Sequence, residues 1–493
     1  MKLAIKLNSK MSNKLNRQAD LLFRKSMSKN IFPFLFLFLF CMLPFQSVRA
    51  QDTTGPVYVV QSGDSLSSIA RQFNVSVKDL MAANNTVDPN LLGVGQQLVI
   101  PGLEGVTGVL QTEVLNFGDS FQGFVRRTKV PAPVLAKLNH IVSPNQLYVG
   151  ASMIVPARDN QSELTARAAL PSGTSLLELA VAQNSDPWTL VGINNLAGSW
   201  DGLPNDALYI LGTGAGQESA GLPSAFLSVE IPYLPFRQGG TTEILVKTIQ
   251  GVKLSGSLND RQLNFFQKDD GTQVALQGIY TLLNQGPYPL SLIATLPDGT
   301  KQTVEQMILV ESGNYPTDPV LSVSPDTIDP TTNDAETKQL TQLTAPITAA
   351  RAWLGKFTNP SPNFPDCHPS YFGNRRNYVG SGTNETYHSF HSGLDFCGQV
   401  GTPIAVAADG TVVFTGMLTV HGNTTIVDHG WGIYTMYCHQ SEINVAVGQQ
   451  VKAGSLIGLV GQTGRVSGPH LHWEVWVNGV QVDPLDWLAN TYP

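Results

Sequence analysis

Histidine is concentrated in the last third of this 493-residue chain, and we expect its chemistry there. Eight of the nine histidines lie in one stretch: His368, His388, His391, His421, His429, His439, His470 and His472. Imidazoles bind transition metals and transfer protons near neutral pH. Their crowding in a chain otherwise poor in histidine indicates a metal site or an acid–base site.

Three short motifs could build that site. Polar and apolar residues alternate in His470–Glu474 (HLHWE), so a strand would place both imidazoles and the carboxylate on one face. His391 and Asp395 are four residues apart, in a turn that leads into an apolar strand. His439 ends the strand-like run 433–438. Each motif alone also occurs in structural roles, but all three in order, separated by strands and glycine turns, indicate a functional site.

This combination resembles the lysostaphin/LytM-type zinc endopeptidases over roughly residues 346–490. The motifs that carry the resemblance are Phe372–Arg376, His391–Phe396, Gly401–Ile404, Tyr437–His439, Gly461–Gly464, Gly468–Glu474 and Val482–Pro484. The resemblance implies a compact, mainly antiparallel β domain with its site in a groove. It also implies one Zn²⁺ per chain with metal ligands His391, Asp395 and His472, and catalytic residues His439 and His470.

These implied roles agree with general zinc chemistry. Three protein ligands leave the fourth tetrahedral position to water, whose pKa zinc lowers toward neutrality. Two further imidazoles can take a proton and stabilise a tetrahedral oxyanion. From the residues alone an alternative stays open, in which His470 holds the metal and His472 faces the substrate, because both project from one face of the strand.

The remaining histidines and the cysteines carry weaker signals. We expect His388 to line the groove, and surface or turn positions for His368, His421 and His429. Cys367 and Cys397 are the favoured disulfide pair in an exported protein, because Cys438 lies inside a predicted strand. Three free buried thiols are the alternative.

A second pattern is an internal repeat with an offset of 55 residues. The offset aligns three turns and three asparagines: Gly63–Leu66, Gly118–Phe121, Gly173–Leu176, Asn84, Asn139 and Asn194. In each unit short strands flank two helices, which predicts a βααβ fold. The first unit resembles a LysM domain closely, the second less well, and the third only by position because it lacks the closing proline.

LysM modules bind glycans that contain N-acetylglucosamine, such as peptidoglycan or chitin, so the resemblance implies a shallow glycan-binding groove. The candidate contact residues are Gly63, Asp64, Ser65, Asn90 and Leu91. Glycine, aspartate and serine are also the usual residues of turns and helix caps. A purely structural role is therefore the alternative for each of them.

Between the repeats and the histidine-rich region, short alternating runs predict an Ig-like β-sandwich. A stretch rich in Pro, Thr and Asp follows, and its composition predicts a linker. The expected fold class is multidomain: α+β LysM-like repeats, an Ig-like β module and a mainly antiparallel-β zinc peptidase domain. The expected domains are 1–50 signal peptide, 57–101 LysM domain, 110–156 LysM-like repeat, 165–211 degenerate LysM-like repeat, 225–311 β-sandwich, 312–345 linker and 346–493 zinc peptidase.

The N-terminal segment reads as an export signal. The apolar run Ile31–Phe45 follows basic residues and precedes small ones, which is typical of a signal peptide, with an uncleaved anchor as the alternative. Residues 51–493 hold 21 Lys and Arg against 36 Asp and Glu, a net charge of −15. Such a polyanion is a poor nucleic-acid binder. After removal of the signal no integral membrane domain is expected, since no other stretch is apolar enough.

The expected function is that of a secreted, cell-wall-associated zinc endopeptidase that hydrolyses peptide bonds of peptidoglycan and is held on glycan by LysM. One rival is a catalytically silent relative that activates a cell-wall amidase. The complete set of site histidines and Asp395 argues against it. A second rival is a glycan-binding adhesion protein.

Overall fold

The computed structural model describes residues 56–61, 64–86, 88, 92–103, 106–128, 130–143, 147–156, 167–170, 173–202, 206–211 and 222–493. The predicted signal peptide lies outside the described residues, as do Gly63, Asn90 and Leu91. Among the described residues, no helix combines the length and apolar character needed to cross a membrane.

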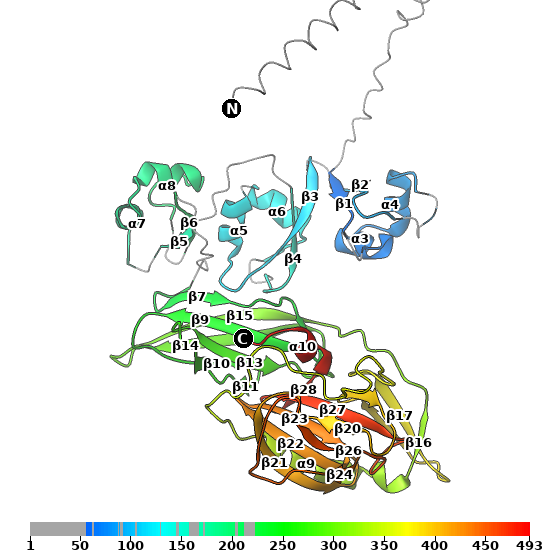
Figure 1. The fold of residues 1–493 in the computed structure, drawn as a ribbon. Helices are drawn as coiled ribbons and strands as arrows, with labels where there is room; N and C mark the ends of the chain where they lie inside the picture. The colour runs from blue at the N-terminus through cyan, green and yellow to red at the C-terminus, as the bar shows by residue number, and fades with distance from the viewer. Residues whose placement is uncertain are drawn as a thin grey trace, which may run out of the picture. The chain divides into compact units, whose positions relative to one another are not determined.

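Each of the three repeats folds as two short strands flanking two helices, as predicted (Figure 1). The elements are β1 (Val57–Val59), α3 (Leu66–Gln72), α4 (Val77–Ala83), β2 (Gln97–Val99), β3 (Val109–Val114), α5 (Phe121–Thr128), α6 (Ala132–Leu138), β4 (Ser152–Pro156), β5 (Arg167–Ala169), α7 (Leu176–Ala182), α8 (Pro187–Ile193) and β6 (Ala207–Tyr209). The first two repeats share a sheet of order β2-β1-β3-β4, and β5 pairs with β6. Ser65 caps α3, because its side chain accepts a hydrogen bond from the backbone of Ser68.

The asparagine that the repeat aligns closes each unit in the same way. Asn84 donates from Nδ2 to the carbonyls of Leu80 and Val99, both at 2.8 Å, and its Oδ1 accepts from the Val99 amide at 2.6 Å. Asn139 and Asn194 make the same three contacts with the equivalent residues. One side-chain amide thus ties the second helix of each unit to the returning strand.

Residues 225–311 form two mainly antiparallel sheets around a shared apolar core, with β8 parallel to β15, so the predicted β-sandwich is seen, while its Ig-like character stays a prediction. One sheet has the order β11-β10-β14-β15-β8, the other β12-β13-β9-β7. The strands are β7 (Phe226–Glu230), β8 (Phe236–Arg237), β9 (Thr241–Thr248), β10 (Lys253–Leu258), β11 (Arg261–Gln262), β12 (Phe266–Gln267), β13 (Gln273–Gly278), β14 (Gly286–Thr295) and β15 (Lys301–Glu311).

This sandwich packs directly on the histidine-rich region. Val274 and Leu276 of β13 belong to the same buried apolar cluster as Trp473. The ring of Phe266 stacks on Trp431, with centroids 4.7 Å apart. Apolar burial of this kind is the main source of stability between packed elements.

The stretch 312–345, expected as a linker, forms secondary structure against the histidine-rich region. Its elements are β16 (Leu321–Val323), the 3-10 helix η2 (Pro325–Thr327) and α9 (Pro330–Thr344). β16 adds to the hairpin of β17 (Arg375–Gly380) and β18 (Thr386–Phe390), and Leu340 of α9 is buried against the main sheet of the histidine-rich region. The composition that predicts a linker misses these contacts because its few apolar residues are widely spaced.

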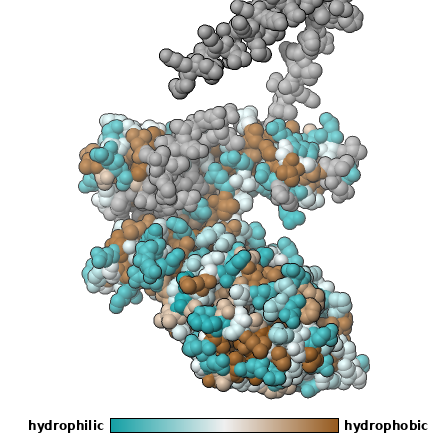
Figure 2. Space-filling view, viewed as in Figure 1, coloured by the Kyte–Doolittle hydropathy of each residue, from teal (hydrophilic) through white to brown (hydrophobic). Residues whose placement is uncertain are grey.

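The histidine-rich region is mainly β, as predicted, and is built on a sheet of order β19-β27-β23-β22-β21-β25. Its elements are β17 (Arg375–Gly380), β18 (Thr386–Phe390), β19 (Leu394–Cys397), β20 (Pro403–Ala405), β21 (Gly410–Leu418), β22 (Gly422–Gly430), β23 (Ile433–Cys438), β24 (Gln440–Ile443), β25 (Gln450–Val451), β26 (Leu456–Val460), β27 (His470–Val477), β28 (Val480–Val482) and α10 (Pro484–Ala489). Hydrophilic and hydrophobic residues are mixed on the face drawn in Figure 2, while large side chains such as Trp473 and Trp487 are buried. Neighbouring strands β19, β27 and β23 bring the three histidine motifs together.

Candidate metal centre

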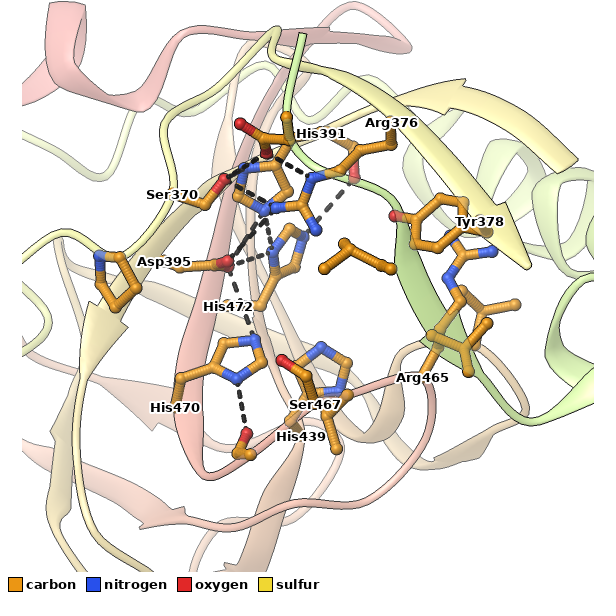
Figure 3. A pocket seen from close by; sticks show the side chains of 18 of the residues that line it. Ser370, Arg376, Tyr378, His391, Asp395, His439, Arg465, Ser467, His470 and His472 are labelled. Atoms are coloured by element: carbon orange, nitrogen blue, oxygen red, sulfur yellow. Dashed lines mark hydrogen bonds and ion pairs between the residues drawn. The ribbon is translucent and has the colours of Figure 1, made fainter. Parts of the chain in front are cut away.

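Two neighbouring strands hold the three predicted metal ligands in one buried cluster (Figure 3). The antiparallel register pairs Asp395 of β19 with His472 of β27, and His391 lies in the turn before β19. Asp395 Oδ1 is 3.0 Å from His391 Nε2 and 2.9 Å from His472 Nδ1, and these two nitrogens are 3.0 Å apart. The H-x-x-x-D and H-x-H motifs therefore converge on one point.

In each of the two histidines predicted as ligands, the ring nitrogen that faces away from the cluster makes a hydrogen bond. His391 donates from Nδ1 to the carbonyl of Tyr371 at 2.8 Å, and His472 donates from Nε2 to Glu474 at 2.9 Å. In neutral rings these bonds leave lone pairs on His391 Nε2 and His472 Nδ1, which face each other beside the Asp395 carboxylate. Three acceptors that face one point fit a cation, and two imidazoles with one carboxylate are a donor set that zinc takes.

Charge at the cluster also favours a cation. Burial raises the pKa of the Asp395 carboxyl, but the adjacent imidazoles of His391 and His472 outweigh it and hold that pKa well below the usual range. Burial likewise opposes charge on His472, yet its bonds to Asp395 and Glu474 raise its pKa above the usual value. The position between these two carboxylates thus favours positive charge, which a proton or a metal ion supplies.

His439 and His470 line the groove, and neither ring makes a hydrogen bond through Nε2 among the described residues. His439 donates from Nδ1 to the carbonyl of Thr463, and His470 donates from Nδ1 to that of Gly468, both at 2.8 Å. Their ring centroids are 4.9 Å apart, and His470 Nε2 is 3.6 Å from Asp395 Oδ1. Burial and the nearby ring of His470 hold the pKa of His439 well below its usual value, so this ring is neutral at pH 7.

The distances favour His472 over His470 as the ligand. His472 Nδ1 lies within 3.0 Å of both His391 and Asp395, whereas His470 Nε2 lies farther from the same carboxylate. Both side chains reach toward Asp395 from β27 (Figure 3), but His472 Nδ1 also lies 3.0 Å from His391 Nε2. The roles themselves stay a proposal.

A groove of about 370 Å³ contains the cluster, and residues without a predicted role complete its wall. The Asp318 carboxylate accepts hydrogen bonds from Asn374 (2.7 Å) and Ser370 (3.2 Å) and pairs with Arg376 Nε at 2.9 Å. Arg376 Nη2 also lies 3.5 Å from Asp395 Oδ2. The sequence signal for Arg376 is its place in the Phe372–Arg376 motif. Asp318 had none, since it lies in the expected linker.

Two of the other histidines do not lie where we expected, and a third has unexpected partners. His421 lies in a turn, as expected, but bridges two buried glutamates, with Nδ1 2.6 Å from Glu336 and Nε2 3.2 Å from Glu474. His429 is fully buried in β22. His388 lies on the exposed side of β18, 2.7 Å from Asn377, rather than in the groove. Isolated histidines lack the periodic context that would reveal such partners from the sequence.

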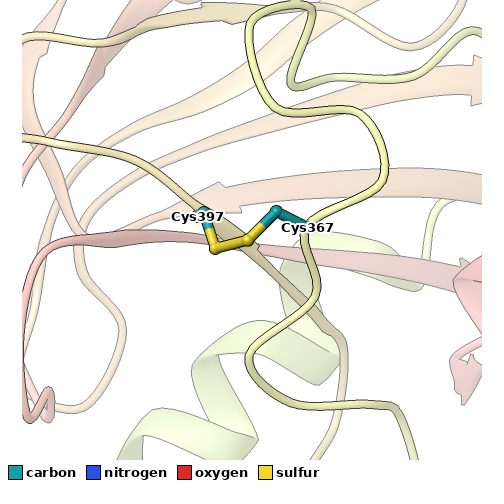
Figure 4. The surroundings of a disulfide bond; sticks show 2 residues. All are labelled: Cys367 and Cys397. Carbon is teal, nitrogen blue, oxygen red and sulfur yellow. A yellow bond between two sulfur atoms is a disulfide. The ribbon is translucent and has the colours of Figure 1, made fainter.

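The structure joins the sulfurs of Cys367 and Cys397 in a disulfide, while Cys438 is buried with a free thiol (Figure 4). The amide of Cys397 also donates to the carbonyl of Cys367 at 3.0 Å. Cys397 pairs with His470 in the register of β19 and β27. The bond therefore fastens the loop that carries Ser370 to the strand that carries Asp395.

Two of the five candidate glycan contacts lie within the described residues, and both have structural partners. Asp64 accepts hydrogen bonds from the Tyr58 hydroxyl at 2.9 Å and the Gln61 amide at 2.7 Å. Ser65 caps α3. These contacts account for both residues structurally, and glycan binding by them stays a prediction.

Comparison with known proteins gives two family matches. Residues 389–484 match the model of Peptidase family M23, and residues 58–101 and 116–156 match the LysM domain. The first match spans the whole metal cluster and both further histidines. The second covers the first two repeats.

Named relatives match the same C-terminal segment. "DD-carboxypeptidase/endopeptidase Mpg" of Neisseria meningitidis is 42% identical over 95 residues, which are 19% of this chain and 22% of the relative. "Peptidoglycan DD-endopeptidase ShyA" of Vibrio cholerae is 45% identical over 95 residues, with the same two shares. The chain thus spans about a fifth of the length of these relatives.

Among solved structures, the catalytic domain of lysostaphin from Staphylococcus simulans is 34% identical, with a TM-score of 0.20. The likeness covers 20% of this chain and 80% of that domain. The assignment therefore rests on the sequence matches and the motifs. The resemblance is confirmed: the chain carries two LysM domains and a C-terminal domain of Peptidase family M23, the family of the lysostaphin- and LytM-type peptidases.

Proposed function

We propose that this chain is an exported, cell-wall-associated zinc endopeptidase that hydrolyses peptide bonds in peptidoglycan. The observation that carries the proposal is the convergence of His391 Nε2, Asp395 Oδ1 and His472 Nδ1 beside the free nitrogens of His439 and His470. Relatives named as peptidoglycan DD-endopeptidases support wall peptide as the substrate.

His391, Asp395 and His472 would hold the ion. When bound, zinc supplies Lewis-acid polarisation of the scissile carbonyl and lowers the pKa of water. The protein's own part is proton transfer. Because Thr463 fixes the Nδ1 hydrogen of His439, its neutral ring presents the Nε2 lone pair to the groove as a proton acceptor.

His470 is held in the same tautomer by Gly468 and presents a second Nε2. Either ring, once it has accepted a proton, becomes a donor that can stabilise a developing oxyanion or protonate the leaving amine. The ion pair of Asp318 and Arg376 lines the groove beside Asp395, where it would limit how a peptide enters.

The LysM domains would keep this catalyst on its substrate. A module that binds wall glycan raises the effective concentration of the peptidase over neighbouring peptide stems. The net charge of −15 after residue 50 means that such binding must rest on short-range contacts rather than on attraction to anionic polymers.

Digestion of purified peptidoglycan tests the proposal. Wild-type protein, metal-stripped protein and zinc-reloaded protein are each incubated with wall material, and the soluble products are identified by mass spectrometry. We expect new peptide amino groups only with metal present, and loss of them in His439→Ala.

The two rivals give different results in the same assay. An amidase activator releases nothing by itself but increases products when a wall amidase is added. An adhesion protein sediments with the wall and releases nothing in either case. Either result would refute the proposed activity.

A further inference from the structure

Helix α9 sends one acidic side chain into the interior beside the metal centre. Glu336 is 6% exposed, and its carboxylate accepts from the backbone amides of Val420 at 2.8 Å and His421 at 3.1 Å. It also lies 2.6 Å from His421 Nδ1. Burying a carboxylate costs free energy that apolar packing does not require, so these contacts call for an explanation beyond helix docking.

The contacts of His421 lead directly to the metal cluster. Its Nε2 lies 3.2 Å from Glu474 Oε1, the oxygen that accepts from His472 Nε2 at 2.9 Å. His421 also offers its backbone carbonyl to the amide of His439 at 2.9 Å. His421, which Glu336 holds through its backbone amide and its Nδ1, therefore supports both a proposed ligand and a proposed catalytic histidine.

A second anchor keeps this arrangement in place. Glu474 is fully buried and also accepts from Trp476 Nε1 at 2.6 Å. With Glu474 fixed, the Nε2 hydrogen of His472 has one direction in which to donate, and Nδ1 is left for the metal. Loss of Glu336 would free His421 to turn and would remove one of the groups that orient Glu474.

We propose that Glu336 is a positioning residue of the metal centre, acting through His421 and Glu474 on His472. This rests on the proposed function, because it takes His391, Asp395 and His472 as the ligands. The functional catalytic unit then begins before residue 346, in the segment whose composition predicts a linker, and it includes a part of the chain outside the family match at 389–484.

Zinc affinity of the full chain tests the proposal without any substrate. We would measure it by competition with a chromogenic chelator for wild type, Glu336→Ala and Glu336→Gln. Loss of a group that bonds a ligand directly weakens metal binding roughly ten- to hundredfold, and Glu336 acts farther out, through His421 and Glu474, so we expect about the lower of these losses in Glu336→Ala. Glu336→Gln should lose less, because its one amide oxygen can still accept from the His421 amide and Nδ1, although the Val420 amide loses its acceptor.

Two controls on the same helix separate positioning from packing. Asp334→Ala removes a carboxylate from the exposed side of α9 and should leave zinc affinity unchanged. Leu340→Ala weakens the apolar docking of α9 and should lower the melting temperature, while the folded protein keeps its zinc affinity.

Wild-type zinc affinity in folded Glu336→Ala would overturn the proposal, and so would an equal loss in Leu340→Ala. If Glu336→Ala does not fold, the zinc affinities of Glu336→Gln and His421→Gln are compared with that of wild type instead. Unchanged zinc affinity in both variants would overturn the proposal. Because zinc affinity is read without wall material, a wild type that fails to digest peptidoglycan would refute the proposed function and leave this test intact.

Discussion

The LysM repeats and the peptidase region use side-chain hydrogen bonds in opposite ways. Asn84 uses both Nδ2 hydrogens and Oδ1 in hydrogen bonds to the backbone of its own repeat. His439 and His470 each donate from Nδ1 to a backbone carbonyl, and their Nε2 atoms make no hydrogen bond among the described residues. A polar group that is only half satisfied by its own fold is therefore the better indication of chemistry.

The two regions also differ in how far along the chain their partners lie. The contact between Asn84 and Val99 spans 15 residues, within one repeat. Asp395 and His472 are 77 residues apart, and Glu336 and His421 are 85 apart. A contact within one repeat recurs along the chain and can be recognised from the sequence. A contact between residues far apart can be predicted only where a motif marks both of them.

Removal of a ligand should have the largest effect. His472→Ala takes away one of three groups that would hold zinc, so the variant should lose stoichiometric metal and all wall digestion. Elemental analysis of the purified protein measures this. The control His388→Ala changes a histidine on the exposed side of β18 and should keep both. One zinc per chain retained in His472→Ala would show that the ligand set is wrong.

Removal of a histidine with a free nitrogen should separate metal from rate. His439→Ala and His470→Ala should keep zinc but digest peptidoglycan more slowly, by about two to four powers of ten. Metal content and turnover are measured side by side. If His470→Ala loses zinc while His472→Ala keeps it, the roles of that pair are reversed.

The repeats should respond in stability alone. Asn84→Ala removes three hydrogen bonds, so the unfolding free energy of the first repeat should fall by about 3 kcal/mol, with zinc content unchanged. Hydrogen exchange of amides in that repeat measures the loss. Lys78→Ala, an exposed change on α4, is the matched control. Equal amide protection in Asn84→Ala and Lys78→Ala would show that the hydrogen bonds of Asn84 do not stabilise the repeat.

The smallest expected effect concerns a buried histidine that supports no ligand. Burial lowers the pKa of His429 from 6.5 to about 4. The unfolded chain therefore binds a proton there before the folded one does, and stability present above pH 6.5 is lost as pH falls toward 4. By pH 5 this group alone should cost about 2 kcal/mol.

Denaturant unfolding at pH 7.5 and pH 5 compares wild type with His429→Asn. The variant should start less stable, because the bonds to Asp409 and Thr435 change, but should lose less stability on acidification. Identical acid dependence in the two proteins would mean that this histidine titrates normally.

The elements and motifs that could be predicted from the sequence are those with a local periodic pattern or with a recognisable motif at each partner. Three βααβ units, the β-rich region and the convergence of His391, Asp395 and His472 all follow from period, spacing and resemblance. The sequence could not predict Glu336 or His421 as partners, because each is a single polar residue without a repeat or a motif. The composition that predicts a linker at 312–345 likewise carries no record of the partners that β16 and α9 contact elsewhere in the chain.

The packing of β13 on the peptidase region has a consequence for how the protein melts. Val274 and Leu276 share a buried core with Trp473, and the ring of Phe266 covers Trp431. Two modules that complete one core cannot lose it independently, so they should unfold in one cooperative calorimetric transition. A substitution in the sandwich would then shorten the lifetime of the peptidase region at elevated temperature through this shared core.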